Sequence, residues 1–70
     1  MEERYTVAEA RRLRNLSQQD MADKLEMAVS TYRNKESGTS KWYTDEASKV
    51  CDILDFEYGR ILFGPDVPKK

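Results

Sequence analysis

The stretch from Ser17 to Gly38 constrains the fold of this 70-residue chain more than any other part of it. Ser17 is a residue type that caps helices, and Asp20 follows three residues later, where its charge favours a helix amino terminus. The apolar residues that then fall on one helical face are Met21, Ala22 and Leu25. A second helix is predicted over residues 28–36, and Gly38 suits the left-handed residue that often ends a helix. The segment therefore predicts two short helices joined by a tight turn.

Helix signals also lie before this segment, whereas strand signals are almost absent from the chain. Thr6 and Glu9 have the spacing of a capping box, which predicts a first helix that ends near Arg14. The residues that we expect this helix to direct toward the core are Val7, Ala10 and Leu13. Asn15 and Leu16 should then separate it from the next helix.

Two further helices are predicted in the second half of the chain, after a loop over residues 37–43. Thr44 is expected to cap the fourth helix, and Asp55 is expected to cap a short fifth helix. The apolar stripe of the fourth helix consists of Ala47, Val50, Cys51 and Leu54. The apolar residues of the fifth helix are Phe56, Ile61 and Leu62. We therefore expect one domain over residues 1–64 and a short polar tail over residues 65–70.

The composition narrows the classes of function. The chain has no histidine and a single cysteine, so it lacks the usual general base and cannot form an internal disulfide or a thiolate zinc site. That cysteine, Cys51, is expected to be a small core residue rather than a nucleophile. Without a glycine-rich phosphate loop or paired carboxylates, the sequence predicts no enzymatic activity, no small-molecule substrate, no cofactor and no metal. The lack of a long apolar run or a signal peptide predicts a soluble cytoplasmic protein with no membrane segment.

The two-helix segment resembles the helix-turn-helix of the lambda-repressor and Cro family of phage and bacterial regulators. The positions that carry this resemblance are Ser17, Gln18, Ala22, Leu25, Tyr32, Glu36 and Gly38. Ala10, Arg11 and Leu16 also fit the first helix of that family, and the likeness extends over residues 6–62. It implies an all-α fold, a compact bundle of five short helices. It also implies a salt bridge between Arg11 and Glu36.

The same resemblance implies a sequence-specific DNA-binding transcriptional regulator, Cro-like or repressor-like, of the phage or prophage type. A homodimer would occupy an operator on double-stranded DNA, with the recognition helix of each subunit in the major groove. The implied base-contacting residues are Val29, Ser30, Arg33 and Asn34. Of these, Asn34 suits an adenine, and Arg33 suits either a guanine or a phosphate. The implied phosphate contacts are Ser17, Gln18, Ser37 and Lys41.

Two residues depart from the pattern of the family. Glu26 stands where the family usually has glycine, so the turn is either strained or differently shaped. Lys35 occupies a position that is normally apolar, and we expect its methylene stem to lie along the core with the amine in solvent. Trp42 is then expected to cover the apolar surface that this substitution leaves open.

The charge balance is unusual for a DNA-binding protein. The net charge is −1 and the pI is near 5.4, with a balance of +1 in residues 1–41 and of −2 in residues 42–70. The basic residues expected to cluster at the DNA face are Arg33, Lys35 and Lys41, and the carboxylates of the last two helices are expected to be solvated. We therefore expect few phosphate contacts per subunit and a modest dependence of affinity on salt. The acidic balance also keeps an alternative open, namely a protein-interaction module on the same fold, such as an antirepressor or an antitoxin-like partner binder.

The end of the predicted fifth helix is more apolar than a terminal helix requires. Its apolar residues are Tyr58, Ile61, Leu62 and Phe63, which belong either to the core or to a contact between the subunits of a dimer. We expect no effector domain or self-cleavage domain after it.

Overall fold

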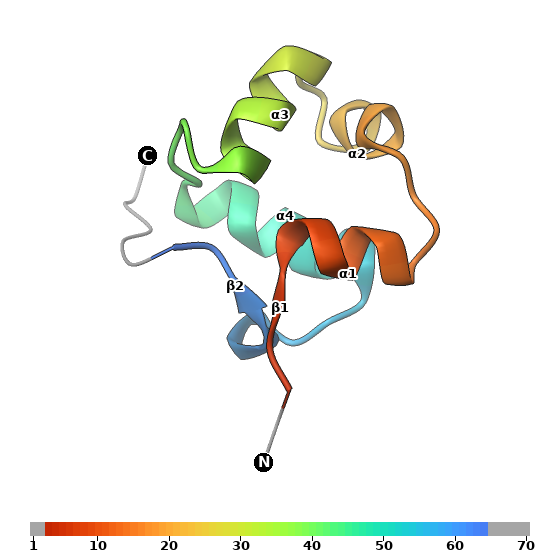
Figure 1. Ribbon diagram of the computed structural model, residues 1–70, viewed down its shortest axis with the longest axis vertical. Helices are drawn as coiled ribbons and strands as arrows, with labels where there is room; N and C mark the ends of the chain where they lie inside the picture. Colours follow the sequence, from red (N-terminus) through yellow and green to blue (C-terminus); the bar gives the residue numbers. More distant parts are fainter. Residues whose placement is uncertain (1–2, 65–70) are drawn as a thin grey trace.

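Four α-helices and a two-stranded parallel sheet make up residues 3–64, the part of the chain that this computed structural model describes. In chain order the elements are β1 (Tyr5–Thr6), α1 (Val7–Leu13), α2 (Gln18–Lys24), α3 (Val29–Ser37), α4 (Thr44–Leu54), a 3-10 turn (Tyr58–Arg60) and β2 (Ile61–Leu62). α1 and α4 lie in the middle of the molecule, α2 and α3 pack together on one side of them, and the sheet lies on the other (Figure 1). The predicted tail over residues 65–70 lies outside the described residues.

The first two helices begin where the sequence predicts, and each begins with a reciprocal cap. Thr6 Oγ1 accepts from the backbone N–H of Glu9 at 3.1 Å, and Glu9 Oε1 accepts from the N–H of Thr6 at 2.9 Å. Ser17 and Asp20 repeat this pattern at 3.0 and 2.9 Å. Backbone donors at both helix starts are thus satisfied by side chains. In both cases the sequence prediction of the capping residue is confirmed.

The expectation that Thr44 caps the fourth helix is wrong by one residue. Tyr43 is the N-cap of α4, because the carboxylate of Glu46 accepts a hydrogen bond from the backbone N–H of Tyr43 at 3.0 Å. The inward stripe of α4 is confirmed, since all four of its predicted residues are buried: Ala47, Val50, Cys51 and Leu54.

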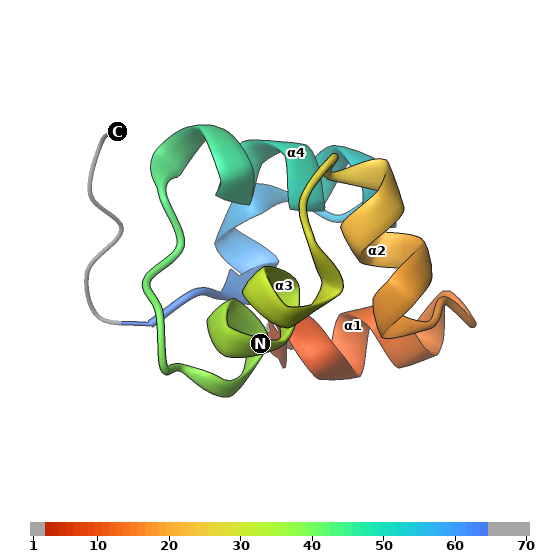
Figure 2. The same cartoon turned by 90° about the horizontal axis from the view of Figure 1, so that it is seen from above.

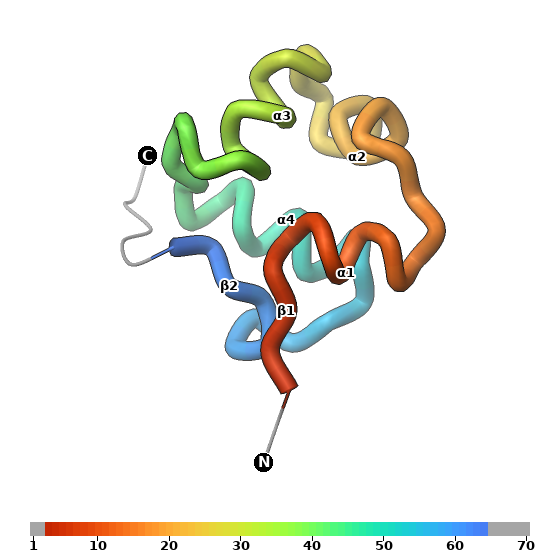
Figure 3. The backbone as a smooth tube through the Cα atoms, in the orientation of Figure 1, coloured from red at the N-terminus to blue at the C-terminus, as the bar shows by residue number. Residues whose placement is uncertain are grey.

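The predicted fifth helix is absent from the described residues, so the bundle has four α-helices rather than five. Asp55 is the left-handed residue that ends α4, with φ of 57°, and it caps no helix. After the 3-10 turn the chain becomes extended and pairs in parallel with β1, Tyr5 opposite Ile61 and Thr6 opposite Leu62. The tube in Figure 3 shows these two distant segments side by side. Each of these two-residue strands forms its hydrogen bonds with the other strand, which is far away in the sequence. No local sequence pattern therefore predicts the sheet.

The core is a single cluster that all four helices and β2 share. Its fully buried large side chains are Tyr32, Met21, Leu54 and Val50. The indole of Trp42 is also buried and makes edge-to-face contacts with the rings of Tyr32 and Phe63. The assignment of Leu13 to the core is wrong, because Leu13 is 55% exposed. α1 buries Val7, Ala10 and Arg11, a helical stripe that leaves Leu13 on the opposite face.

Lys35 is buried together with its ammonium group, contrary to the expectation that the amine reaches solvent. Its Nζ lies 2.9 Å from Glu46 Oε1 and donates to the carbonyl oxygen of Lys41 at 2.9 Å. The same atom lies 4.9 Å from the centre of the Tyr43 ring and 5.9 Å from that of Trp42. Glu46 is therefore paired with Lys35 and is not simply solvated. This contact ties α3 to the start of α4 and removes Lys35 from the proposed DNA face.

Three of the helices end with a left-handed residue that is not glycine. These residues are Asn15, Glu26 and Asp55, with φ of 57° or 58°. After Glu26, the backbone N–H of Met27 donates to the carbonyl oxygen of Ala22 at 3.0 Å, the bond of a Schellman motif. The turn between α2 and α3 thus keeps the shape that glycine normally gives. Of the two alternatives for Glu26, the structure selects backbone strain.

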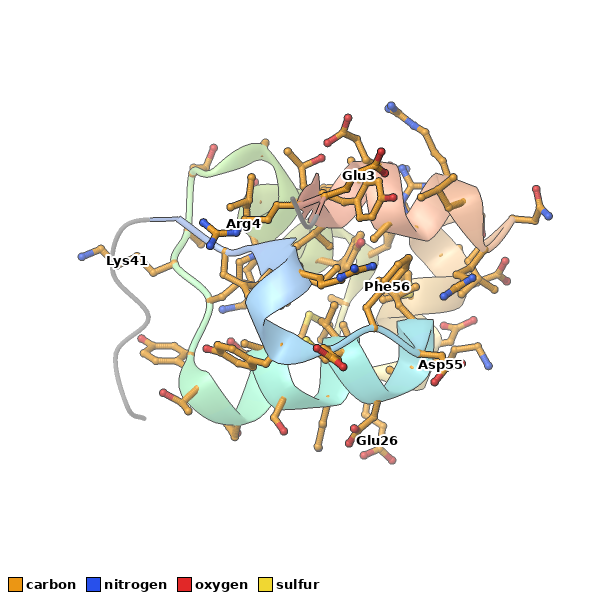
Figure 4. The ribbon with its side chains drawn as sticks, turned by 90° about the horizontal axis from the view of Figure 1, so that it is seen from below. Glu3, Arg4, Glu26, Lys41, Asp55 and Phe56 are labelled. Atoms are coloured by element: carbon orange, nitrogen blue, oxygen red, sulfur yellow. The ribbon has the colours of Figure 1, made fainter. Side chains whose placement is uncertain are left out.

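Glu26→Gly is expected to raise the free energy of unfolding by about 0.5–1 kcal/mol, because glycine adopts positive φ without the steric cost while giving the unfolded chain more freedom. Figure 4 shows the Glu26 side chain directed away from the body of the protein, and the residue is exposed, so little packing is lost. Urea unfolding followed by the fluorescence of Trp42 measures the change. Glu57→Gly is the matched control, since it removes an exposed glutamate at φ of −65° and should give no gain. A variant Glu26→Gly less stable than the wild type would contradict the strained turn.

Candidate nucleic-acid interface

A buried ion pair fixes the position of α3 relative to α1. Arg11 Nε lies 3.0 Å from Glu36 Oε2, and Arg11 Nη2 donates to Glu36 Oε1 at 3.2 Å. Arg11 Nη1 donates to the carbonyl oxygen of Leu16 at 2.8 Å, just before α2. The two side chains are only 10% and 8% exposed. The salt bridge that the family resemblance implies is therefore present, and it is buried rather than a surface contact.

Glu36 accepts two further hydrogen bonds that sequence reasoning missed. The hydroxyl of Tyr32 donates to Oε2, and Gln18 Nε2 donates to Oε1 at 3.1 Å. Burial by itself would raise the pKa of Glu36, but the hydrogen bonds from Arg11, Tyr32 and Gln18 outweigh it and lower the pKa below its ordinary value. Burial and the hydrogen bond to Glu36 raise the pKa of Tyr32. The i, i+4 spacing of Tyr32 and Glu36 on one helix is the signal that could have revealed the first of these contacts.

The outward face of α3 is polar. Its exposed residues at spacings of three and four are Ser30, Arg33, Asn34 and Ser37, here called the outward stripe. Three of the four predicted base-contacting residues lie on it. The fourth, Val29, is half-buried and packs against the core at the first position of α3. Viewed from above in Figure 2, α3 lies in front of the core, next to α2.

The residues predicted to contact phosphate lie around the outward stripe. Gln18 is the first residue of α2, and its Oε1 accepts from Arg33 Nε at 3.1 Å, which joins the two helices at the surface. Ser17 caps α2 from the preceding position and is exposed. Ser37 Oγ donates to the carbonyl oxygen of Asn34 at 3.1 Å. Lys41 follows in the loop, and Figure 4 shows its side chain projecting outward.

The segment predicted as core or dimer contact contains both buried and exposed residues. Ile61 is buried in the core, so for this residue the core alternative holds and the dimer alternative does not. Leu62 is 49% exposed and Tyr58 is 46% exposed. Phe63 is half-buried, with its ring 5.6 Å from that of Tyr58. An exposed apolar group thus remains around β2, and Leu62 and Phe63 line a pocket together with Glu36 and Ser37 at the end of α3.

Among residues 3–64, no group of three or more side chains suits a metal ion. No helix in the same range combines the length and apolar character needed to cross a membrane. Cys51 is a free thiol in the core, where burial raises its pKa.

A comparison with protein-family models gives one informative match, to a family described as helix-turn-helix, over residues 7–59. The matched range begins at the first residue of α1 and ends in the 3-10 turn, so it contains all four helices. Searches of curated proteins and of solved structures find no match.

Glu36→Gln is expected to lower the free energy of unfolding at pH 7 by about 3 kcal/mol, because Arg11 keeps a buried charge without a counter-charge. It should also flatten the dependence of stability on pH. Since the pKa of Glu36 is lowered in the folded protein, the unfolded state binds more protons as the pH falls below about 4.5, and wild-type stability is lost there. Urea unfolding at a series of pH values measures both effects.

Tyr32→Phe provides a milder comparison, because it removes one donor to Glu36 and keeps the carboxylate. It should reduce the amount of stability lost on acidification, because the pKa of Glu36 in the folded protein is then lowered less. Glu57→Gln, at an exposed position outside this network, is the control and should leave the pH dependence unchanged. An acid response of Glu36→Gln identical to that of the wild type would rule out Glu36 as the source of this stability.

Proposed function

The chain belongs to the helix-turn-helix family of the lambda repressor and Cro, a family of DNA-binding domains, and from this premise we propose that it is a sequence-specific transcriptional regulator of the phage or prophage type. α3 enters the major groove of an operator, and α2 lies across the adjacent phosphate backbone. The regulator acts by occupancy in the cytoplasm of a bacterial or phage-infected cell, where it blocks or recruits polymerase.

The observation that supports this proposal best is the outward stripe on a helix whose inner face is fixed by buried ion pairs. Arg11–Glu36 and Lys35–Glu46 hold α3 from two sides, so its outward side chains keep a defined position. Base readout requires such positioning, because hydrogen-bonding groups must meet the edges of base pairs. Asn34 is suited to an adenine, and Ser30 to any of several bases. Val29 would pack on a thymine methyl group through the exposed part of its side chain.

The phosphate contacts of this proposal are few. The residues assigned to them are Ser17, Gln18, Ser37 and Lys41, of which only Lys41 is charged. Gln18 has one amide N–H left after its bond to Glu36, and we assign this N–H to a phosphate of the DNA backbone. The affinity should therefore depend only moderately on salt concentration.

A selection from random duplexes at low salt tests the proposal. We expect recovery of a palindrome whose half-sites lie about one helical turn apart. Asn34→Ala should then weaken binding to the selected sequence by about 1–3 kcal/mol and relax the preference at one position. Thr31→Ala, at an exposed position of α3 outside the outward stripe, is the matched control and should change neither.

A selection that enriches no sequence, with binding insensitive to salt, would overturn this function. The result would favour the alternative of a protein-interaction module, which the net charge of −1 supports. If a sequence is enriched but Asn34→Ala does not weaken binding to it, the protein still binds DNA. α3 is then not the element that reads the bases.

We propose that the dimer forms through the exposed apolar group formed by Tyr58, Leu62 and Phe63. Leu62→Glu should reduce the affinity for a palindrome about tenfold or more by removing the contact between subunits, while binding to a single half-site stays unchanged. Leu13→Glu is the matched control, since it places the same charge at an exposed leucine of α1. Electrophoretic mobility shifts with one and two half-sites measure the difference. Equal losses in both variants would contradict this dimer surface.

A further inference from the structure

A chain of hydrogen bonds connects the buried ion pair to an exposed side chain on the outward stripe. Glu36 Oε1 accepts from Arg11 Nη2 at 3.2 Å and from Gln18 Nε2 at 3.1 Å. The other end of the Gln18 amide, Oε1, accepts from Arg33 Nε at 3.1 Å. Gln18 is half-buried and lies between a buried carboxylate and an exposed guanidinium. Its side chain therefore links the core to the surface of α3.

The orientation of the Gln18 amide in this chain follows from its two neighbours. The carboxylate of Glu36 is ionised, since its pKa is lowered, and it only accepts hydrogen bonds. The guanidinium of Arg33 only donates. The NH₂ group must therefore face Glu36 and the carbonyl oxygen must face Arg33. The buried ion pair thus determines which polar atom Gln18 offers to Arg33.

The bond to Gln18 also determines which atoms of Arg33 remain for a ligand. With Nε engaged, the two terminal nitrogens form an end-on pair of donors at the tip of the side chain. A guanine presents two acceptors, N7 and O6, side by side in the major groove, and a planar pair of donors matches them. Arg33 also lies between the two polar positions of the outward stripe assigned to bases, one helical turn after Ser30 and directly before Asn34.

We propose that Arg33 reads a guanine in the operator, and that Gln18 is a positioning residue that presents its terminal nitrogens to that base. This inference rests on the proposed function, because it names the base that one side chain of α3 recognises. A phosphate contact would need the charge of Arg33 but not the engagement of Nε, since lysine binds phosphate as a point charge. The two targets therefore differ in how they depend on Gln18 and on the guanidinium shape.

The experiment compares the selected duplex with duplexes in which each base pair is replaced in turn. For the wild type, replacing the G·C pair that Arg33 reads should weaken binding roughly 5- to 150-fold. Arg33→Ala should abolish this discrimination, Arg33→Lys should reduce it because the planar pair of donors is lost, and both should leave the preferences at other positions intact. Gln18→Ala should reduce the discrimination at the same pair by about 2- to 12-fold, because the side chain of Arg33 must then be ordered on binding.

Two controls isolate the positioning role of Gln18. Any phosphate contact that Gln18 makes weakens all duplexes equally, so it cancels in the ratio between matched and replaced duplexes. In an Arg33→Ala background, Gln18→Ala should have no further effect on that ratio. Gln19→Ala is the matched control, because Gln19 is the next residue and its amide donates to Asp23 at 2.8 Å rather than contacting Arg33. Thermal unfolding confirms that each variant is folded.

The experiment distinguishes a failure of the proposed DNA-binding function from a failure of the inference on Arg33 and Gln18. If the wild type enriches no sequence, the proposed function fails and this inference fails with it. If a sequence is enriched but Arg33→Ala weakens all duplexes equally and lowers the salt slope by about one, Arg33 contacts a phosphate and only this inference is overturned. Discrimination that is undiminished in Arg33→Lys would also overturn it. Equal effects of Gln18→Ala and Gln19→Ala on the ratio would overturn the positioning role.

Discussion

The carboxylate of Glu36 accepts hydrogen bonds from side chains of three helices, and the arrangement of the helix-turn-helix depends on it. Arg11 comes from α1, Gln18 from α2 and Tyr32 from α3 itself. A buried carboxylate is costly unless such donors surround it, so the three helices are held in the one arrangement that supplies them. A second buried pair, Lys35–Glu46, ties the same carboxyl-terminal turn of α3 to α4. Together the two pairs anchor the carboxyl-terminal turn of this nine-residue helix to α1 and α4.

This arrangement separates the two faces of α3 by function. The inner face holds charges that are buried and paired, whereas the outer face holds polar groups that are exposed. The two buried pairs remove two carboxylates and two cations from the surface together, so the net charge of −1 is unchanged by them. The contribution of Lys35 to the DNA face is lost for the same reason. The outer face of α3 is therefore suited to recognise bases through hydrogen bonds rather than to bind DNA through accumulated positive charge.

The sequence predicted the features that depend on residues close together in the chain. Thr6 and Ser17 caps, the stripe of α4 and the left-handed Gly38 follow from spacing and backbone preference, and the structure contains all of them. The features it could not predict depend on distant partners. The ammonium of Lys35 is buried because a carboxylate and a carbonyl oxygen from the next segment meet it there. In the same way, Arg14 donates to the carbonyl oxygens of Leu54 and Asp55 at 2.6 and 3.1 Å, which ties α1 to the end of α4 without any local signal.

In the proposed function, the outward stripe of α3 and the start of α2 form the DNA-binding surface. Mapping of backbone amide chemical shifts during titration with duplex DNA at low salt tests it directly, because even non-specific binding uses the phosphate-contacting face. We expect the largest shifts at Gln18, Ser30, Arg33 and Asn34, with little change on the side that carries the sheet. Shifts concentrated at Tyr58 and Leu62, with α3 unaffected, would contradict it.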